Sequence, residues 1–571
     1  MHRIAPIPGG WNLDAEGVIL LEQTAAPIVI LTAADTDIQT LSVSLVKLPP
    51  EFPAIRVANL MQLQQQLSID HYADTVLSQA KVIVLRLLGG RSYWSYGLEV
   101  VREIAEDTGA SLFILPGDDR PDPEAIAHST VPLAAVNRLW RYWIEGGRDN
   151  IVNALKFIAD TCLGTKYSPP PPQEVPRIGL YSWQNYVGNS TDLSQQLSGE
   201  NSSVAIIFYR AHYLAGNTLP IDALCQALLQ NNLKPLPIFV SSLREPEIQE
   251  ILLSYCQSKT GNTVQLLLNT TSFSLAKLDE NIDLADSLYL WQKLDIPVLQ
   301  VIFSSGTEAQ WESSLLGLSP RDIAMNVALP EVDGRIITRA ISFKSVKTWN
   351  SALETDVVIY QPRLDRINWI ADLSANWVRL KNTPIADRKI ALILANYPNR
   401  DSRIANGVGL DTPTSCLAIL KALKAAGYLV ENIPETGDEL IRQLTASVTN
   451  DLETQNLRPI NQSLSLTDWQ EYFSKLPEII QQAISDRWGN SEHELVIPGI
   501  ELGNIFVGIQ PARGYDRDPS LNYHAPDLEP TPEYLAYYHW LRTQFVVQAI
   551  IHIGKHGNLE WLPGKIGRAH V

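Results

Sequence analysis

The stretch VVQAIIHIGKHGNLEWLPGK, residues 546–565, guides the interpretation of the whole chain. Its apolar run Ala549–Ile553 is rich in β-branched residues and is followed by glycine. Such a run is typical of a buried parallel strand that leads into a loop. His552 then lies at the carboxyl end of the strand, with His556 and Glu560 just beyond it. Because open α/β sheets bind ligands at this edge, we expect a site here.

These three side chains carry metal or proton-transfer chemistry. Two imidazoles and a carboxylate at four-residue spacing can ligate a divalent transition metal, or bind it briefly and move protons around it. A helix would also place His552, His556 and Glu560 on one face, but Gly554 and Gly557 disfavour a helix. The alternative is that His552 is a core histidine and His556 a turn residue, because the spacing matches no zinc consensus.

Composition bounds the class of protein. The 571 residues are too many for one core and predict roughly three to four domains of about 150 residues each. With 45% apolar and 19% charged residues, the chain is typical of a globular protein. The formal charge of −17 argues against nonspecific binding of nucleic acid or anionic membranes.

Other sequence features concern the cellular compartment. The four cysteines are widely spread and form no C-x-x-C pair, which suits a reducing compartment. The first residues contain no apolar run long enough for a signal peptide, and no segment approaches 18 uninterrupted apolar residues. We therefore expect a cytoplasmic protein with no membrane span.

The alternation of short apolar runs and amphipathic stretches predicts a multidomain α/β fold, with several parallel-sheet units of Rossmann or flavodoxin type and helical insertions. We expect an α/β domain over residues 1–167, a stiff proline-rich spacer at 168–176 and a second α/β domain over 177–387. The last region, 388–571, would begin the catalytic part and carry a helical insertion at about 436–491. Predicted strands lie at 27–31, 81–88, 111–115, 178–181, 204–209, 236–240, 264–268, 298–303 and 389–398, and predicted helices at 96–108, 137–162, 221–230, 245–256 and 413–426.

Two loops of the second domain are candidate ligand sites. In FYRAHYLAGNTLPIDAL, residues 208–224, Arg210 and Asn217 are expected in a loop where they can hold carboxylates, although Asn217 can equally cap the next helix. The loop SSGTEAQW after residue 303 resembles a phosphate-cradling loop in composition only. The chain contains no G-x-x-x-x-G-K-[ST] motif, so any ATP would bind another polypeptide.

The last region offers further charged loop residues. Arg400, Asp401 and Arg403 follow a strong apolar strand, and Asp411 or Thr412 is expected to cap the helix after it. Farther on, residues 508–541 hold a proline-bounded loop and then an aromatic helix. By default we interpret the aromatic stripe of that helix as core.

The segment HIGKHGNLEWLPGK resembles the H-x-G-x-H-G-x-x-E-W-x-P-G-K signature of the large subunits of multi-subunit metal chelatases, the family of CobN and of the large magnesium-chelatase subunits. Four more passages are similar to the cobalt branch: GGRSYW, FYRAHYLAGNT, ANYPNRDSRIANGVGLDTP and QPARGYDRDPSLNYHAPDLEP. The resemblance implies ATP-dependent insertion of Co²⁺ into hydrogenobyrinic acid a,c-diamide in cobalamin biosynthesis. AAA+ partner subunits would bind ATP and Mg²⁺.

The resemblance also implies roles for individual residues. The macrocycle would lie over the strand end, with its substituents held by a binding set. His552 and His556 would deliver the metal, and Glu560, with His556, would take part in catalysis by accepting pyrrole protons. The binding set expected from the resemblance and the loops is Arg513, His524, Arg210, Asn217 and Arg403.

Three alternatives remain open from sequence. They are a large magnesium-chelatase subunit acting on protoporphyrin IX with Mg²⁺, a non-catalytic tetrapyrrole or metal carrier, and a self-contained metal hydrolase. Members of the family are about twice as long as this chain, and only IGRAHV follows the PGK. We therefore expect a truncated fragment whose last six residues are artefactual.

Overall fold

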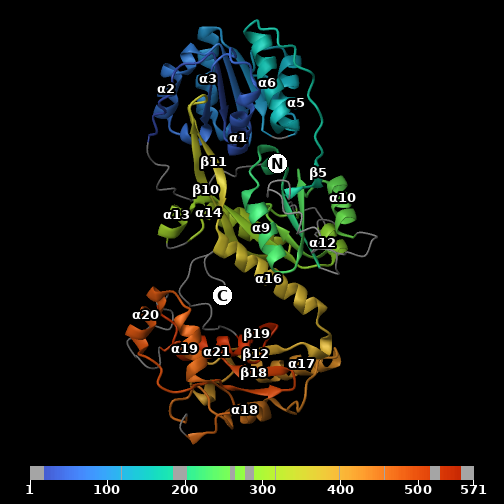
Figure 1. Cartoon of the computed structure of the whole chain (residues 1–571), viewed down its shortest axis with the longest axis vertical. Helices are drawn as coiled ribbons and strands as arrows, with labels where there is room; N and C mark the ends of the chain where they lie inside the picture. The colour runs from blue at the N-terminus through green and yellow to red at the C-terminus, as the bar shows by residue number, and fades with distance from the viewer. Residues whose placement is uncertain are drawn as a thin grey trace. The chain divides into compact units, whose positions relative to one another are not determined.

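The computed structural model describes residues 18–117, 119–183, 202–257, 264–276, 288–314, 317–397, 399–454, 457–514 and 528–554. The chain divides into two compact units, Met1–Ala375 and Asn376–Lys565, which are described separately. Helix α16 (Leu364–Asn382) contains the division. Both units combine parallel-containing sheets with helices (Figure 1), which confirms the predicted multidomain α/β class. The predicted boundaries at 167, 177 and 388 stay a prediction.

The first sheet of unit 1 is fully parallel. Its strands are β1 (Ile28–Thr32), β2 (Ile55–Asn59), β3 (Val82–Leu87) and β4 (Ser111–Pro116), in the order β2-β1-β3-β4. This is the strand order of flavodoxin-like sheets. Strands β1, β3 and β4 match predicted strands, whereas β2 was not predicted.

Alternate residues of these strands face two different helical layers. Val29 and Leu31 pack with α2 (Gln66–Thr75) and α3 (Ser95–Thr108). Ile28 and Ile30 pack on the other side, with α1 (Asp35–Ser44), α5 (Leu133–Glu145) and α6 (Gly147–Cys162). Burial on both faces explains why the strands are continuous apolar runs.

The second sheet of unit 1 has seven strands in the order β11-β10-β9-β8-β6-β7-β5. Its five central strands are parallel, and β5 and β11 are antiparallel at the edges. The strands are β5 (Ile178–Leu180), β6 (Ser203–Tyr209), β7 (Lys234–Val240), β8 (Val264–Asn269), β9 (Val298–Thr307), β10 (Ile336–Asn350) and β11 (Thr355–Pro362). The associated helices include α8 (Arg210–Ala215), α9 (Leu219–Gln230), α10 (Pro246–Cys256), α12 (Tyr289–Leu294), α13 (Glu308–Ser313), α14 (Pro320–Ile323) and α15 (Leu329–Val332).

The long β10–β11 hairpin, which sequence analysis missed, connects the two sheets of unit 1 (Figure 1). Leu353, between its strands, packs in the core of the first sheet, and its carbonyl accepts a hydrogen bond of 3.2 Å from the backbone N–H of Val57. Lys344 on β10 forms an ion pair of 2.6 Å with Asp35. These contacts explain why two predicted domains form one compact unit.

The proline-rich segment 168–176 lies against the first sheet's helices instead of spanning a gap. Arg138 donates a hydrogen bond of 2.8 Å to the carbonyl of Pro169, and Tyr142 donates one to the carbonyl of Pro170. Asn150 exchanges two hydrogen bonds with the backbone of Gln173, at 2.8 and 2.9 Å. Side chains of α5 and α6 therefore satisfy part of the segment's backbone, and its role as a spacer between two domains stays a prediction.

Unit 2 is built on a four-stranded sheet in the order β17-β18-β12-β19. Its strands are β12 (Ile390–Leu394), β17 (Gly499–Leu502), β18 (Ile505–Ile509) and β19 (Ala549–Ile553), of which β18, β12 and β19 are parallel. One face packs on α17 (Thr412–Ala425) and α18 (Gly437–Thr445), and the other on α19 (Leu466–Ser474) and α21 (Pro532–Thr543). Helix α20 (Glu478–Trp488) follows α19, and the assignment of residues 436–491 as an insertion stays a prediction.

Strand β19 confirms one prediction and corrects another. The run Ala549–Ile553 is a strand and pairs in parallel with β12, as expected. It was expected to be buried, yet Ile551 and His552 are exposed. The reason is its position: among the described residues β19 pairs with β12 alone and forms an edge of the sheet.

In unit 1, His212 of α8 is enclosed by aromatic rings. Its ring centroid lies 6.2 Å from that of Tyr209, 6.1 Å from Phe303 and 5.3 Å from Tyr360. Its Nδ1 is buried and has no hydrogen-bond partner among the described residues. Burial, helped by the nearby charge of Lys344, lowers the pKa of His212 from 6.5 to about 4. The ring is therefore neutral in the folded protein near pH 7.

This enclosure predicts a pH-dependent stability. Between pH 6.5 and about 4 the unfolded chain binds a proton at His212 that the folded chain does not. The contribution to the free energy of unfolding, ~3 kcal/mol, is thus fully present above pH 6.5 and lost as the pH falls toward 4. We expect His212→Phe to remove this part of the pH dependence in chemical denaturation. The same substitution at the partly exposed His71 is the control, and equal slopes for wild type and His212→Phe would contradict the prediction.

Candidate functional site

In unit 2, three neighbouring parallel strands end in polar residues at one sheet edge. Gln510 follows β18, Asn396 follows β12 by one residue, and His552 lies in β19. The backbone N–H of Gln510 donates to the carbonyl of Leu394 at 2.9 Å, and His552 is in register with Ile393. The carboxyl edge predicted from residues 546–565 therefore exists, and His552, Asn396 and Gln510 lie at or just after the ends of its three parallel strands.

His552 is suited to bind a metal or accept a proton. Its imidazole is exposed, and its ring centroid lies 6.1 Å from that of Tyr538 on α21. Partial desolvation lowers the pKa of His552 below 6.5, so the ring is neutral near pH 7 and keeps a lone pair for a ligand.

The two companions predicted for His552, His556 and Glu560, lie outside the described residues, as does His524. Within the ranges that the structure describes, no group of three or more His, Cys, Asp or Glu side chains is arranged to hold a metal. The predicted metal set therefore stays a prediction beyond the placement of His552.

Beside this edge the chain forms what we call the edge segment, residues 397 and 399–411. It ends in a small hairpin of β13 (Asn406–Gly407) and β14 (Leu410–Asp411). Its base is held to β12 because Ala405 N–H donates to the carbonyl of Ala395 at 2.8 Å. Three apolar side chains of the segment face solvent: Tyr397 is 42%, Val408 82% and Leu410 44% exposed. Exposed apolar groups beside a sheet edge are typical of a binding surface.

The edge segment also carries two available positive charges. Arg400 and Arg403 are exposed, and neither guanidinium has a hydrogen bond or ion pair within the described part of the chain. Asp401 between them is occupied, because its carboxylate pairs with Arg458 at 2.5 Å and accepts from Thr449 Oγ1 at 2.6 Å. The segment therefore presents apolar surface together with cations that suit carboxylates. Asp411 caps α17 through the N–H of Thr414, as one of the two predicted caps.

Arg513 occupies a different environment. It is fully buried after β18, and its guanidinium donates to the carbonyl of Leu528 at 3.2 Å. The aromatic residues Tyr534, Tyr537 and Trp540 of α21 are also buried, which confirms the core interpretation of that stripe. The predicted carboxylate-binding role of Arg513 stays a prediction.

Arg210 and Asn217 belong to unit 1, and their polar groups are used within it. Arg210 opens helix α8 where a loop was expected, so that expectation was wrong. Asn217 accepts a hydrogen bond of 3.1 Å from the N–H of Tyr360. The guanidinium of Arg210 donates to the carbonyls of Ile144, Glu145, Val175 and Pro176 at 3.1, 2.7, 3.0 and 2.8 Å. These contacts give both side chains a structural role, and their substrate-binding role stays a prediction.

The serine-rich segment after residue 303 donates hydrogen bonds to a carboxylate of the same chain, that of Asp322. Strand β9 continues through it, so the predicted loop is strand and then helix α13. Asp322 accepts hydrogen bonds from Ser304 Oγ at 2.8 Å and from the N–H of Ser305 at 3.0 Å. The Asp322 carboxylate thus takes the position that a phosphate would need.

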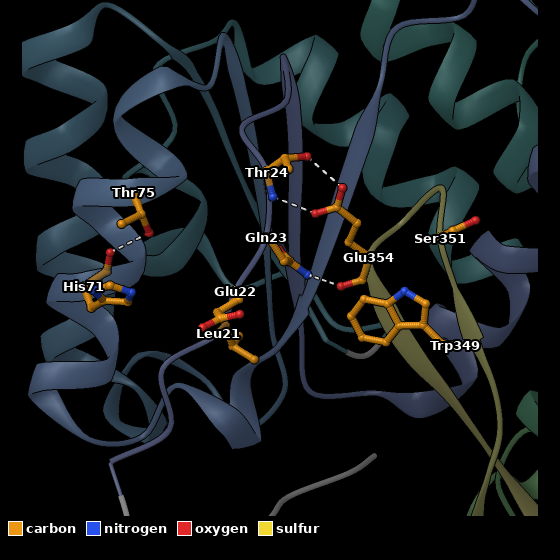
Figure 2. A pocket seen from close by; sticks show the side chains of 9 residues that line it. All are labelled: Leu21, Glu22, Gln23, Thr24, His71, Thr75, Trp349, Ser351 and Glu354. Atoms are coloured by element: carbon orange, nitrogen blue, oxygen red, sulfur yellow. Dashed lines mark hydrogen bonds between the residues drawn. The ribbon is translucent and has the colours of Figure 1, made fainter.

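Unit 1 also has an open cavity of about 610 Å³, lined by none of the predicted site residues. Figure 2 shows His71 on α2 and Trp349 on the β10–β11 hairpin at opposite sides of it, with the 21–24 segment between them. Its polar groups are largely bonded to each other. Glu354 accepts from the N–H and hydroxyl of Thr24 at 2.6 and 2.7 Å and pairs with Arg56 at 2.8 Å. We assign it no ligand.

Asn396 and Gln510 are candidate site residues that were not predicted from the sequence. Both are buried, with exposed fractions of 1% and 2%. The available signal was their position directly after apolar strands, since the carboxyl ends of parallel strands meet at one edge.

Comparison with known proteins agrees with this geometry. The family model described as CobN/Magnesium Chelatase matches residues 140–567. The chain belongs to this family. It is 42% identical to the aerobic cobaltochelatase subunit CobN of Pseudomonas aeruginosa, over 99% of this chain and 45% of that protein. It is 28% identical to the H-type subunit of the magnesium chelatase of Chlorobaculum parvum, over 75% of this chain and 33% of that protein.

A solved relative shows the family fold. The catalytic subunit of cobaltochelatase from Mycobacterium tuberculosis superposes with a TM-score of 0.66 and 30% identity, over 95% of this chain and 44% of that one. The chain therefore spans less than half the length of these relatives. Among the described helices, none is long and apolar enough to cross a membrane.

The two arginine environments predict different effects on stability. Arg210→Ala removes charge-assisted hydrogen bonds to four carbonyls and should lower the free energy of unfolding by ~3 kcal/mol. Arg403→Ala removes an exposed side chain with no such bonds and should change it by no more than about 0.5 kcal/mol. Chemical denaturation of both variants measures the difference. Equal effects would contradict the structural role of Arg210.

Proposed function

We propose that this chain forms the macrocycle- and metal-binding part of the large subunit of a cobaltochelatase. The enzyme inserts Co²⁺ into hydrogenobyrinic acid a,c-diamide in cobalamin biosynthesis. The observation that carries the proposal is that unit 2 exposes His552 near the carboxyl end of β19, and exposes apolar groups and two available arginines in the edge segment that follows the neighbouring strand β12. Family membership supports it, because curated members carry the name cobaltochelatase.

The chemistry of the edge segment suits a tetrapyrrole. Such a macrocycle has a flat apolar centre and carboxylates at its rim. Tyr397, Val408 and Leu410 offer apolar contact, and Arg400 and Arg403 offer charge-assisted hydrogen bonds to the carboxylates. His552 would supply a neutral imidazole for the entering substrate metal at the carboxyl end of the same sheet.

Metal insertion also requires proton removal. As the dication enters, the pyrrole nitrogens lose protons, which a nearby base must accept. Glu560 and His556, which follow His552 in sequence, are the residues that we propose for this role. Arg513 and His524 remain further proposed contacts of the macrocycle.

Cobalt is favoured over magnesium on two grounds. Imidazole ligands suit cobalt better than magnesium, which prefers oxygen ligands. The chain is also more similar to the cobaltochelatase subunit than to the magnesium-chelatase subunit, at 42% against 28% identity. ATP and its Mg²⁺ would bind AAA+ partner subunits, because no P-loop motif is present in this chain.

The lowered pKa of His552 predicts how Co²⁺ binding depends on pH. Only the neutral imidazole binds a metal, and this ring stays neutral to a lower pH than an ordinary histidine. The part of Co²⁺ binding that depends on His552 should therefore be complete at pH 7 and be lost with a midpoint below pH 6.5. Isothermal titration of wild type and His552→Ala across pH 5 to 7.5 measures it, with His493→Ala as the control. A midpoint at or above 6.5 would contradict the prediction.

An insertion assay tests the function itself. Hydrogenobyrinic acid a,c-diamide and protoporphyrin IX are offered with Co²⁺ or Mg²⁺, ATP and AAA+ partners, both to the 571-residue chain and to the complete gene product. We expect cobalt insertion into the corrin by the complete product. Glu560→Gln should lower kcat at least about a hundredfold and leave macrocycle affinity within about twofold, because a general base acts only in the transition state.

Any other result of the insertion assay would support a different function or reject a residue assignment. Magnesium insertion into protoporphyrin IX would make the protein a magnesium-chelatase subunit. Macrocycle binding without insertion under all conditions would favour a carrier. Equal loss of kcat and affinity in Glu560→Gln would reject the assignment of Glu560 as the base.

A further inference from the structure

Asn396 is a buried polar side chain without a partner. It is 1% exposed, and neither its amide nitrogen nor its amide oxygen has a hydrogen-bond partner among the residues that the structure describes. Buried side-chain amides are nearly always paired, because leaving both groups unpaired costs stability. At the carboxyl end of the sheet, where α/β proteins bind ligands, an unpaired amide of this kind indicates that a bound ligand forms its hydrogen bonds.

The backbone around Asn396 is well fixed. The N–H of Ala395 donates to the carbonyl of Ile553 at 3.0 Å, and the carbonyl of Ala395 accepts from Ala405 at 2.8 Å. Asn396 itself forms an antiparallel bridge with Ile404 at the base of the edge segment. The residue is therefore held between the strand that carries His552 and the segment that carries Arg400 and Arg403.

The chemistry of the amide restricts the ligand group. An asparagine side chain has one acceptor and an NH₂ donor, so its full complement is a group that both donates and accepts. A primary carboxamide satisfies this requirement through two hydrogen bonds side by side. A carboxylate accepts only and would leave the Asn396 oxygen unpaired.

We propose that Asn396 recognises a primary carboxamide at the rim of the macrocycle, and so determines preference for an amidated tetrapyrrole over its parent acid. This rests on the proposed function, since it assumes that a tetrapyrrole occupies the edge. Because the amide is enclosed, a ligand reaches it only if the Asn396–Ile404 bridge and the hydrogen bond from Ala405 to Ala395 open on binding. Arg400 and Arg403 would bind the remaining carboxylates, which leaves amide recognition to Asn396.

Asn396→Leu separates this role from a structural one. Leucine has the same number and branching of side-chain heavy atoms as asparagine and removes two unpaired polar groups, so the variant should unfold at the same or a higher denaturant concentration than wild type. It should also bind hydrogenobyrinic acid a,c-diamide about tenfold more weakly. Affinity for hydrogenobyrinic acid, which carries no amides, should stay within about twofold. A merely structural asparagine would not give this combination.

The experiment is an absorbance titration of the 571-residue chain with both macrocycles, for wild type, Asn396→Leu and the exposed control Asn461→Ala. We expect wild type and Asn461→Ala to prefer the diamide, and Asn396→Leu to lose the preference.

Any of four results would overturn the inference. Equal affinities of wild type for the two macrocycles would reject amide recognition and leave the proposed function standing. An unchanged preference in Asn396→Leu would do the same. Lower stability of Asn396→Leu would assign the amide to folding, and loss of Co²⁺ binding without macrocycle would assign it to the metal. Binding of neither macrocycle to wild type would instead reject the proposed function at its base.

Discussion

The parallel hydrogen bonding of β12 is the constraint on which unit 2 depends. All five residues of the strand are buried, and they pair in register with β18 on one side and β19 on the other. Alternate side chains then face two separate helical layers, so neither face is open to a ligand. Only the end of the sheet remains, and parallel pairing brings Asn396, Gln510 and His552 to that end together.

The residues of the candidate site fall into an exposed group and a buried group. The groups that face solvent are apolar side chains and arginines of the edge segment, together with His552. The groups beneath them, Asn396, Gln510 and Arg513, are almost fully enclosed. Hydrogen bonds and charges are stronger where water is excluded, so under the proposed function the inner groups would discriminate among ligands and the outer ones would attract them.

Prediction from sequence succeeded where local pattern decides structure and failed where distant contacts decide it. Strands β1 and β19 are apolar runs bounded by turn residues, and each was expected close to its observed bounds, whereas the strand expected at 389–398 ends at Leu394. The β10–β11 hairpin was missed because its polar stretches are stabilised by contacts with the first sheet. Arg210 and Arg403 look alike in sequence, and only burial distinguishes a guanidinium bonded to four carbonyls from one that is available. Asn396 carries no charge, so its importance depends on an enclosure that sequence does not show.

The proline-rich segment in unit 1 has a mechanical consequence. A polyproline tether between two sheets would normally let each sheet turn independently. Here Arg210 and side chains of α5 and α6 bind its carbonyls, and the β10–β11 hairpin joins the sheets a second time. The two sheets are thus joined at two separate places. Two connections restrict rotation of one sheet relative to the other more than a single flexible linker would.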